Sequence, residues 1–155
     1  MKKLLLILLC LPMIGCMDTA EEYFDRAMDF YIDGEYQLSI DNFTKCLRVD
    51  SDYSLAYSGR GDMHHKLGNY KEAIADYTRA IGVDTDNRLA HYGRGNTHQD
   101  LGEYKLALAD YTRAISIDPE YLAAYTGRAI VNNMLGNYTA YAADSRKVRE
   151  ILNSY

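Results

Sequence analysis

The stretch Ala-Asp-Tyr-Thr-Arg-Ala-Ile occupies residues 75–81 and recurs letter for letter at residues 109–115. The same offset of 34 residues relates four glycines: Gly34, Gly68, Gly102 and Gly136. Four units therefore follow one another without a gap: 20–53, 54–87, 88–121 and 122–155. A fixed period of this length indicates a repeat array, in which each unit buries its apolar face only by stacking on its neighbours.

Each unit is predicted to hold two helices. The first helix ends at one of the periodic glycines, because helix termination commonly requires a left-handed residue and glycine adopts that conformation without penalty. The second helix has apolar residues at three- and four-residue steps, in 70–83 at Tyr70, Ala73, Ile74, Tyr77, Ala80 and Ile81. No alternation typical of strands is sustained anywhere, so the sequence predicts an all-α protein.

The helix ends carry further predictions. Asn69 and Asn137 each precede a second helix and are good N-cap residues. The aspartates that follow second helices are predicted to cap the next helix: Asp50, Asp84 and Asp118. Gly61 and Gly95 lie inside first helices, where glycine is roughly 1 kcal/mol less favourable than alanine. Their recurrence predicts close contact between neighbouring helices.

This pattern resembles the tetratricopeptide repeat throughout residues 20–155. The signature positions of the second unit are Tyr57, Gly61, Leu67, Gly68, Tyr70, Ala73, Tyr77 and Ala80. Those of the third unit are His91, Gly95, Leu101, Gly102, Tyr104, Ala107, Tyr111, Ala114 and Pro119. The resemblance implies an α-solenoid of four antiparallel helix pairs in a right-handed superhelix. The final helix departs at Tyr141, Ser145 and Val148, as a terminal unit with one unpartnered face is expected to do.

Residues 1–15 are predicted to be a lipoprotein signal peptide, in which two lysines precede a leucine-rich run too short for a comfortable transmembrane span. Residues 11–16 resemble a bacterial lipobox, which implies that Cys16 carries lipid such as palmitate and that 16–19 form a short tether. An uncleaved signal anchor is the alternative. Met17 stands where an aspartate would be a retention cue, which favours the outer membrane.

The predicted location is therefore the bacterial cell envelope, with the chain anchored by lipid at the periplasmic face or the cell surface. Cys46 is left without a disulfide partner and is predicted to be a small buried thiol. The formal charge is −5, and it becomes −7 without Lys2 and Lys3. An acidic chain of this kind argues against nucleic acid as a partner. Membrane association would then come from acyl chains.

Arginines and acidic residues also recur with the period. The arginines, one in each first helix, are Arg26, Arg60, Arg94 and Arg128, and the aspartates of the second helices are Asp76, Asp110 and Asp144. One interpretation is a ladder that binds anions. The favoured interpretation is a set of bidentate ion pairs that hold the two helices of a unit together.

No catalytic, metal or cofactor site is predicted. His91 and His98 lie two turns apart on one helix, too far for the i, i+4 pairing of a metal site, and no carboxylate or cysteine spacing completes a set for His64 or His65. These histidines are interpreted as packing or groove residues. A nucleophile elbow, a phosphate loop and a metalloprotease helix are absent from the sequence, so the chain is predicted not to be an enzyme.

The resemblance also implies a concave face built from the first helices. The groove positions fall on Phe24, Met28 and Tyr31; on Leu55, Ser58, Asp62 and His65; on Leu89, Tyr92, Asn96 and Gln99; and on Thr126, Ile130 and Asn133. Aromatic, aliphatic and amide groups together suit a peptide or helix segment. The positions at which the chaperone-binding subclass holds a terminal carboxylate carry Phe24, Met28, Gly59, Leu89 and Gly93, which excludes that subclass.

The sequence thus predicts a scaffold that binds a peptide or helix of another protein, with Tyr92 and Asn96 near the centre of the groove. The alternative is a structural subunit that assembles with copies of itself through Tyr141, Tyr155 and the last helix. The two hypotheses differ in whether the groove or the C-terminal helix makes the functional contact.

Overall fold

The computed structural model describes residues 18–154, and every regular element in that range is an α-helix. The helices are α1 (Ala20–Ile32), α2 (Tyr36–Val49), α3 (Ser54–Lys66), α4 (Tyr70–Val83), α5 (Arg88–Asp100), α6 (Tyr104–Ile117), α7 (Leu122–Met134) and α8 (Tyr138–Asn153). The predicted all-α fold is confirmed. The predicted signal peptide at 1–15 and the predicted lipid site at Cys16 lie outside the described residues.

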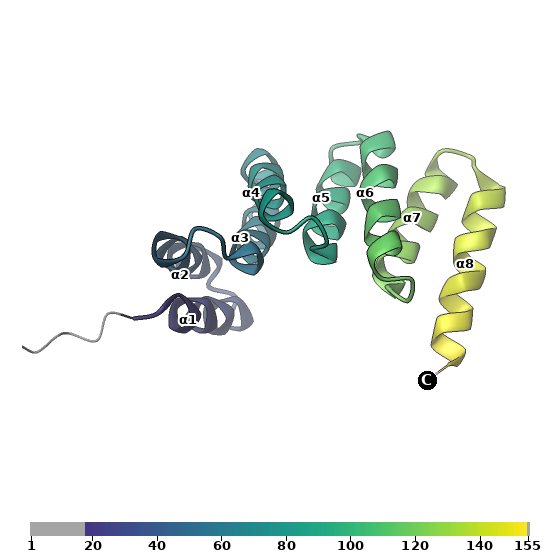
Figure 1. Ribbon diagram of the computed structural model, residues 1–155. Helices are drawn as coiled ribbons and strands as arrows, with labels where there is room; N and C mark the ends of the chain where they lie inside the picture. The colour runs from purple at the N-terminus through teal and green to yellow at the C-terminus, as the bar shows by residue number, and fades with distance from the viewer. Residues whose placement is uncertain (1–17, 155) are drawn as a thin grey trace, which may run out of the picture.

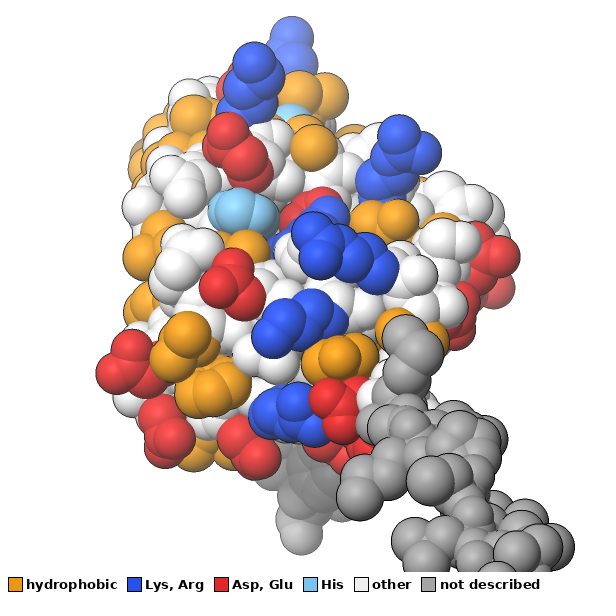
Figure 2. All heavy atoms as spheres, turned by 90° about the vertical axis from the view of Figure 1, so that its left-hand side faces the viewer, with side chains coloured by type: hydrophobic (Ala, Val, Ile, Leu, Met, Phe, Trp, Pro, Cys, Tyr) orange, Lys and Arg blue, Asp and Glu red, His pale blue; other side chains and the backbone are white. Residues whose placement is uncertain are grey.

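The helices stack in chain order as four antiparallel pairs, with α1 and α8 at opposite ends (Figure 1). Each helix packs on its neighbours in sequence, and α5 also contacts both α3 and α7. The first helices α3, α5 and α7 therefore form one continuous inner layer, and the predicted solenoid is confirmed. The end formed by α1 and α2 mixes acidic, basic and apolar side chains (Figure 2).

Glycine ends each first helix as predicted. Gly34, Gly68, Gly102 and Gly136 have φ between 74° and 79°, the left-handed region. At the end of α3 the Gly68 N–H donates to the carbonyl of His65 (2.9 Å) and the Asn69 N–H donates to that of His64 (2.9 Å). These are the two bonds of a Schellman motif, so the last carbonyls of the helix are satisfied where the chain reverses.

The caps predicted at the two asparagines and at the aspartates are wrong. Asn69 and Asn137 precede α4 and α8, but neither side chain caps its helix, because the Schellman turn sets a ψ of about 61–62° in place of the extended backbone of a capping residue. The aspartates do not cap the next helix either. Asp84 instead accepts from the N–H of Asp86 within the turn (3.0 Å), and α5 is capped by Asn87, which accepts from the N–H of Ala90 (3.0 Å).

A tyrosine between two glycines joins each middle pair to the next. Tyr77 of α4 is 1% exposed, and a Cβ atom on Gly61 or Gly93 would come within 2.9 or 2.5 Å of its ring. Tyr111 meets Gly95 and Gly127 in the same way. The close contacts predicted for Gly61 and Gly95 are confirmed. Each tyrosine ring lies in a notch formed by one glycine of its own pair and one glycine of the following pair.

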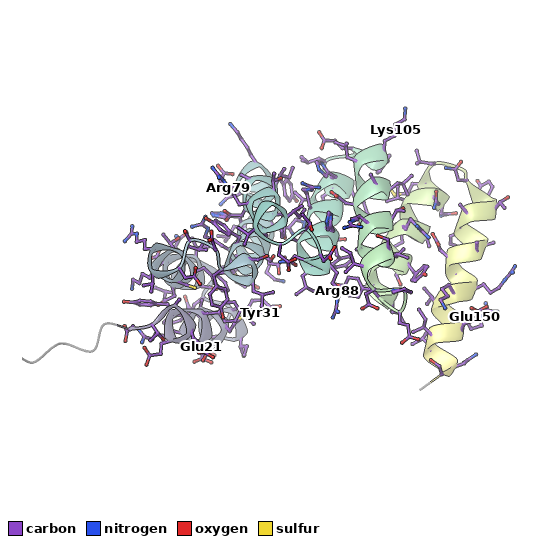
Figure 3. The ribbon with its side chains drawn as sticks, in the orientation of Figure 1. Glu21, Tyr31, Arg79, Arg88, Lys105 and Glu150 are labelled. Atoms are coloured by element: carbon purple, nitrogen blue, oxygen red, sulfur yellow. The ribbon has the colours of Figure 1, made fainter. Side chains whose placement is uncertain are left out.

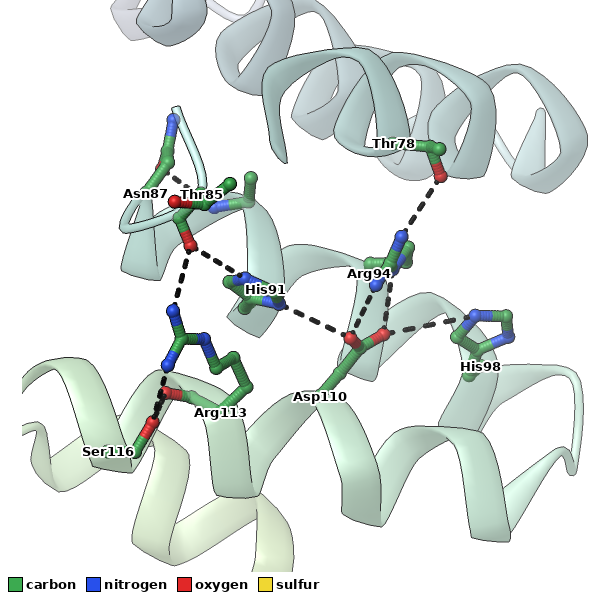
Figure 4. A network of polar contacts seen from close by, with 10 residues as sticks. Thr78, Thr85, Asn87, His91, Arg94, His98, Asp110, Arg113 and Ser116 are labelled. Carbon is green, nitrogen blue, oxygen red and sulfur yellow. Dashed lines mark hydrogen bonds and ion pairs between the residues drawn. The ribbon is translucent and has the colours of Figure 1, made fainter. Parts of the chain in front are cut away.

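The predicted ion pairs are confirmed, and each reaches a third helix. Arg94 of α5 donates from Nε and Nη2 to the two carboxylate oxygens of Asp110 (2.9 and 2.8 Å), and from Nη1 to the hydroxyl of Thr78 in the preceding pair (3.1 Å) (Figure 4). Arg60 and Arg128 repeat this arrangement. The guanidinium groups are thus engaged within the stack, and the anion ladder is not formed.

The first pair lacks a preceding unit, and its arginine pairs elsewhere. Arg26 contacts Asp18 (3.1 Å), and Asn42 stands where the other pairs have an aspartate and donates to the carbonyl of Leu38 (2.8 Å). The core of this pair is built on Phe43, which is fully buried.

We expect Arg94→Met to lower the free energy of unfolding by about 3 kcal/mol, because it leaves the buried carboxylate of Asp110 without its main partner. Arg79→Met, on the exposed face of α4, is the matched control and should change stability by less than about 0.5 kcal/mol. Chemical denaturation of the three proteins measures both effects. Equal losses of stability in the two variants would show that the ion pair between Arg94 and Asp110 does not stabilise the chain.

Two helical glycines give a second, signed prediction. Gly93→Ala forces a methyl group against the ring of Tyr77 and should destabilise the chain by about 2 kcal/mol. Gly82→Ala places the same methyl group in α4, where nothing lies within 4 Å, and should stabilise it by up to about 1 kcal/mol. If thermal unfolding shows that the melting temperatures of both variants shift in the same direction, the close fit of the Tyr77 ring against Gly93 is contradicted.

Candidate binding groove

The inner layer contains a hollow of about 340 Å³. Its walls come from the end of α1, from α3 and α5, and from the turn before α7, with Tyr77 of α4 at its base. The lining residues are Tyr31, Asp62, His65, Lys66, Tyr77, Leu89, Tyr92, Gly93, Asn96 and Tyr121. Figure 3 labels Tyr31 and Arg88 on the lower side of the stack in that view. A volume at the lower end of the range for ligand sites suits one side chain of a longer segment.

The buried tyrosines extend from the core into this inner layer. The hydroxyl of Tyr77 donates to Oδ1 of Asp62 (2.6 Å). The hydroxyl of Tyr111 contacts the amide oxygens of Asn96 (2.7 Å) and Gln99 (2.8 Å). The rings that lock neighbouring pairs therefore also hold the polar groups of the groove in place.

Asp62 is a carboxylate in an aromatic setting. Solvent reaches it from the open side of the hollow, but the surrounding walls desolvate it, and this raises its pKa despite the hydrogen bond from Tyr77. Burial likewise raises the pKa of Tyr77, helped by the neighbouring Asp62 charge. The Tyr77 hydroxyl is thus a donor at neutral pH, and Asp62 accepts from it.

The aromatic rings of the hollow already attract cations. The ring of Tyr92 meets that of Tyr121 edge to face, with centroids 5.3 Å apart. The guanidinium of Arg88 lies 5.2 Å from the centroid of Tyr121, and the ammonium of Lys66 lies 5.6 Å from that of Tyr31. Burial, followed by the proximity of Tyr92, raises the pKa of Tyr121 to about 12, so the ring carries a neutral phenol.

Six of the predicted groove residues line the hollow: Tyr31, Asp62, His65, Leu89, Tyr92 and Asn96. Gln99 joins them through the hydroxyl of Tyr111. The other predicted residues lie outside the hollow. Phe24 and Met28 pack on the core of the first pair, where Phe24 stacks on Tyr53 (5.2 Å), and Leu55, Ile130 and Asn133 are exposed.

Four lining residues were not predicted: Lys66, Tyr77, Gly93 and Tyr121. Tyr77 was assigned to the core, and nothing in the sequence indicates that its hydroxyl emerges on the inner layer. Tyr121 lies in the turn between pairs, where the equivalent residues are Tyr53 and Asn87, so the period itself gives no signal for it.

His65, His91 and His98 contact carboxylates, whereas His64 lies 3.9 Å from an oxygen of Asp76 and its buried Nδ1 has no hydrogen-bond partner among residues 18–154. His65 contacts Asp100 (3.0 Å) at the edge of the hollow. His91 and His98 lie on either side of the ion pair between Arg94 and Asp110, with ring nitrogens 3.4 and 3.9 Å from oxygens of Asp110 (Figure 4). Among residues 18–154 no cluster of three or more His, Cys, Asp or Glu side chains could hold a metal ion. In the same range no helix combines the length and apolarity required to cross a bilayer.

Two family comparisons match the middle of the chain. Residues 61–102 match the family described as TPR repeat, and residues 89–121 match that described as tetratricopeptide repeat. Together with the four stacked helix pairs, these matches identify the class: the chain is a tetratricopeptide repeat protein. No curated protein sequence matches it significantly.

Solved structures share the fold at low identity. A crystal structure of MamA is 22% identical, with a TM-score of 0.81 over 87% of this chain and 79% of that one. The TPR domain of Arabidopsis OM64 is 21% identical, with a TM-score of 0.73 over 75% of this chain and 96% of that one. The first TPR of Spaghetti (RPAP3), bound to the HSP90 peptide SRMEEVD, is 20% identical, with a TM-score of 0.74 over 76% and 94%.

The raised pKa of Asp62 predicts that ionisation of this groove residue lowers the stability of the fold as the pH rises. Because its folded pKa lies above the unfolded value of about 3.9, its contribution to stability is full below that value and is lost as the pH rises through the folded pKa. Asp62→Asn does not titrate and so has no such loss. As the pH rises from about 3.5 to 7, the free energy of unfolding of the variant should therefore increase relative to that of the wild type. Denaturation at both pH values checks this, and a constant difference would contradict it.

Proposed function

We propose that the chain is a non-enzymatic scaffold that binds an extended or helical segment of another protein in the hollow of its inner layer. The observation that carries this proposal is the combination, on one concave face, of aromatic rings, a carboxylate and oriented amides. Apolar anchors with a few placed polar groups are what peptide recognition requires. The Spaghetti domain, which shares the fold, is a case in which the array holds a peptide.

The chain is further proposed to be a lipoprotein of the bacterial cell envelope, attached through Cys16 after removal of residues 1–15. The start of the fold supports a short tether. Thr19 accepts from the N–H of Glu22 (3.1 Å), the Glu22 side chain accepts from the N–H of Thr19 (2.7 Å), and α1 begins at Ala20. The array would therefore lie close to the membrane surface, with the outer membrane favoured by Met17.

Self-assembly through the C-terminal helix is a second candidate, favoured by exposed apolar side chains on α8. Tyr138 is 68% exposed and Leu152 is 59% exposed. Continued stacking of copies is not supported, however, because the ends lack the tyrosine and glycine of the inner junctions: α8 has Ser145 in place of the tyrosine, and α1 has Asp25 in place of the glycine. Assembly would need a different contact, and deletion of 149–155 would then change the oligomeric mass.

A photo-cross-linking residue in place of Leu89 tests the groove in living cells. Leu89 lines the hollow and is 43% exposed, so a bound segment should be captured there. The same residue in place of Leu106, which is 51% exposed on α6 outside the hollow, is the matched control and should capture nothing specific. Adducts are measured by gel shift and mass spectrometry.

The double variant Tyr92→Ala with Asn96→Ala should abolish the adduct at position 89 while leaving the helical content unchanged. An adduct that survives the double variant, or that forms equally from position 106, would show that the partner does not use the hollow.

Metabolic labelling with an alkyne analogue of palmitate tests the anchor. We expect Cys16→Ser to abolish the label and to release the protein from the membrane fraction. Cys46→Ser should retain the label, because Cys46 is fully buried in the first pair and burial raises the pKa of its thiol to about 11. Labelling that survives Cys16→Ser would remove the lipoprotein assignment.

A further inference from the structure

The carboxylate of Asp62, which lines the hollow, has acceptor positions that no donor of the chain occupies. Within residues 18–154 its one hydrogen bond comes from the hydroxyl of Tyr77, and no Arg, Lys or His side chain forms an ion pair with it. An ionised carboxylate offers about four acceptor positions. The remaining ones face a partly desolvated space, where a charged donor would be bound more strongly than in water.

The basic side chains near the hollow have other contacts, although Lys66 and His65 are close enough to lower the pKa of Asp62 through space. Lys66 lies over the rings of Tyr31 and Tyr36, at 5.6 and 5.8 Å from their centroids. Arg88 lies over Tyr121 and pairs with Asp118 (3.3 Å). His65 is engaged by Asp100 (3.0 Å). The phenol rings that attract cations therefore line the same hollow as Asp62, and within residues 18–154 its carboxylate interacts with Lys66 and His65 only through space, without a direct ion pair.

We propose that the hollow receives an arginine side chain of the partner segment, with its guanidinium on Asp62 and against the ring of Tyr92; the ring of Tyr121 already holds Arg88. This inference rests on the proposed function and specifies the chemistry of the partner. Arginine fits better than lysine because its planar head forms two parallel bonds to a carboxylate and stacks on aromatic faces. The formal charge of −5 attracts a basic segment over a longer range.

Asn96 gives the segment a second contact. Its amide oxygen shares the single proton of the Tyr111 hydroxyl with the amide oxygen of Gln99 (2.7 and 2.8 Å), and its amide nitrogen is left as a donor. A donor beside the arginine site suits a backbone carbonyl of an extended chain. The two contacts together define a short basic motif.

The test is a selection of random 12-residue peptides on the full chain in detergent micelles. Peptides that bind the wild type but not the Tyr92→Ala, Asn96→Ala variant are groove ligands. We expect these ligands to share an arginine. Replacement of that arginine by citrulline, its neutral isostere, should weaken binding to the wild type by about tenfold or more, as measured by fluorescence anisotropy.

Asp62→Asn separates this proposal from a general charge effect. The variant keeps an oxygen that accepts from Tyr77, and against it the citrulline replacement should matter by less than about twofold. Asp100→Asn, at the edge of the same hollow, is the matched control and should retain the full effect of citrulline. Three outcomes would overturn the arginine site and leave the groove intact. The groove ligands could lack arginine, citrulline could weaken binding to the wild type and to Asp62→Asn equally, or the effect of citrulline could be lost in Asp100→Asn. Failure to obtain any groove ligand would overturn the proposed function with it.

Discussion

The structure depends on the fit of a buried phenol ring into a notch made by two glycines of successive helices. Tyr77 between Gly61 and Gly93, and Tyr111 between Gly95 and Gly127, bring the inner helices so close that no larger residue fits at these positions. Packing of this density is sensitive to single methyl groups. The fit sets the spacing of the pairs, and the spacing in turn determines the width of the hollow on the inner layer.

Polar contacts fix the register that the apolar contacts allow. Arg60, Arg94 and Arg128 each join the aspartate of their own pair to the threonine of the pair before, as Arg94 joins Asp110 and Thr78. A bidentate pair has a defined geometry, whereas a ring in a notch can still rotate or slide. The seven-residue stretch that the chain repeats contains all the groups that this joint needs on the second helix.

The sequence predicted several features that recur with the period, but it missed the helix caps and the features that depend on the end of the array or on side-chain direction. The glycines that end the first helices and the ion pairs follow from the spacing, and the solenoid follows from the resemblance to the tetratricopeptide repeat. Phe24 was predicted to line the groove, but it stacks on Tyr53 and packs against Phe43 in the core of the first pair. The role of Tyr121 in the hollow could not be predicted because it lies in a turn whose equivalent residues differ in type.

Tyr77 belongs to two environments at once: its ring closes the junction between the second and third pairs, and its hydroxyl reaches the carboxylate of the hollow. Occupancy of the hollow and cohesion of that junction are therefore thermodynamically linked. A guest that engages Asp62 as proposed would stiffen the middle of the array, and by reciprocity any force that opens the junction would release that guest.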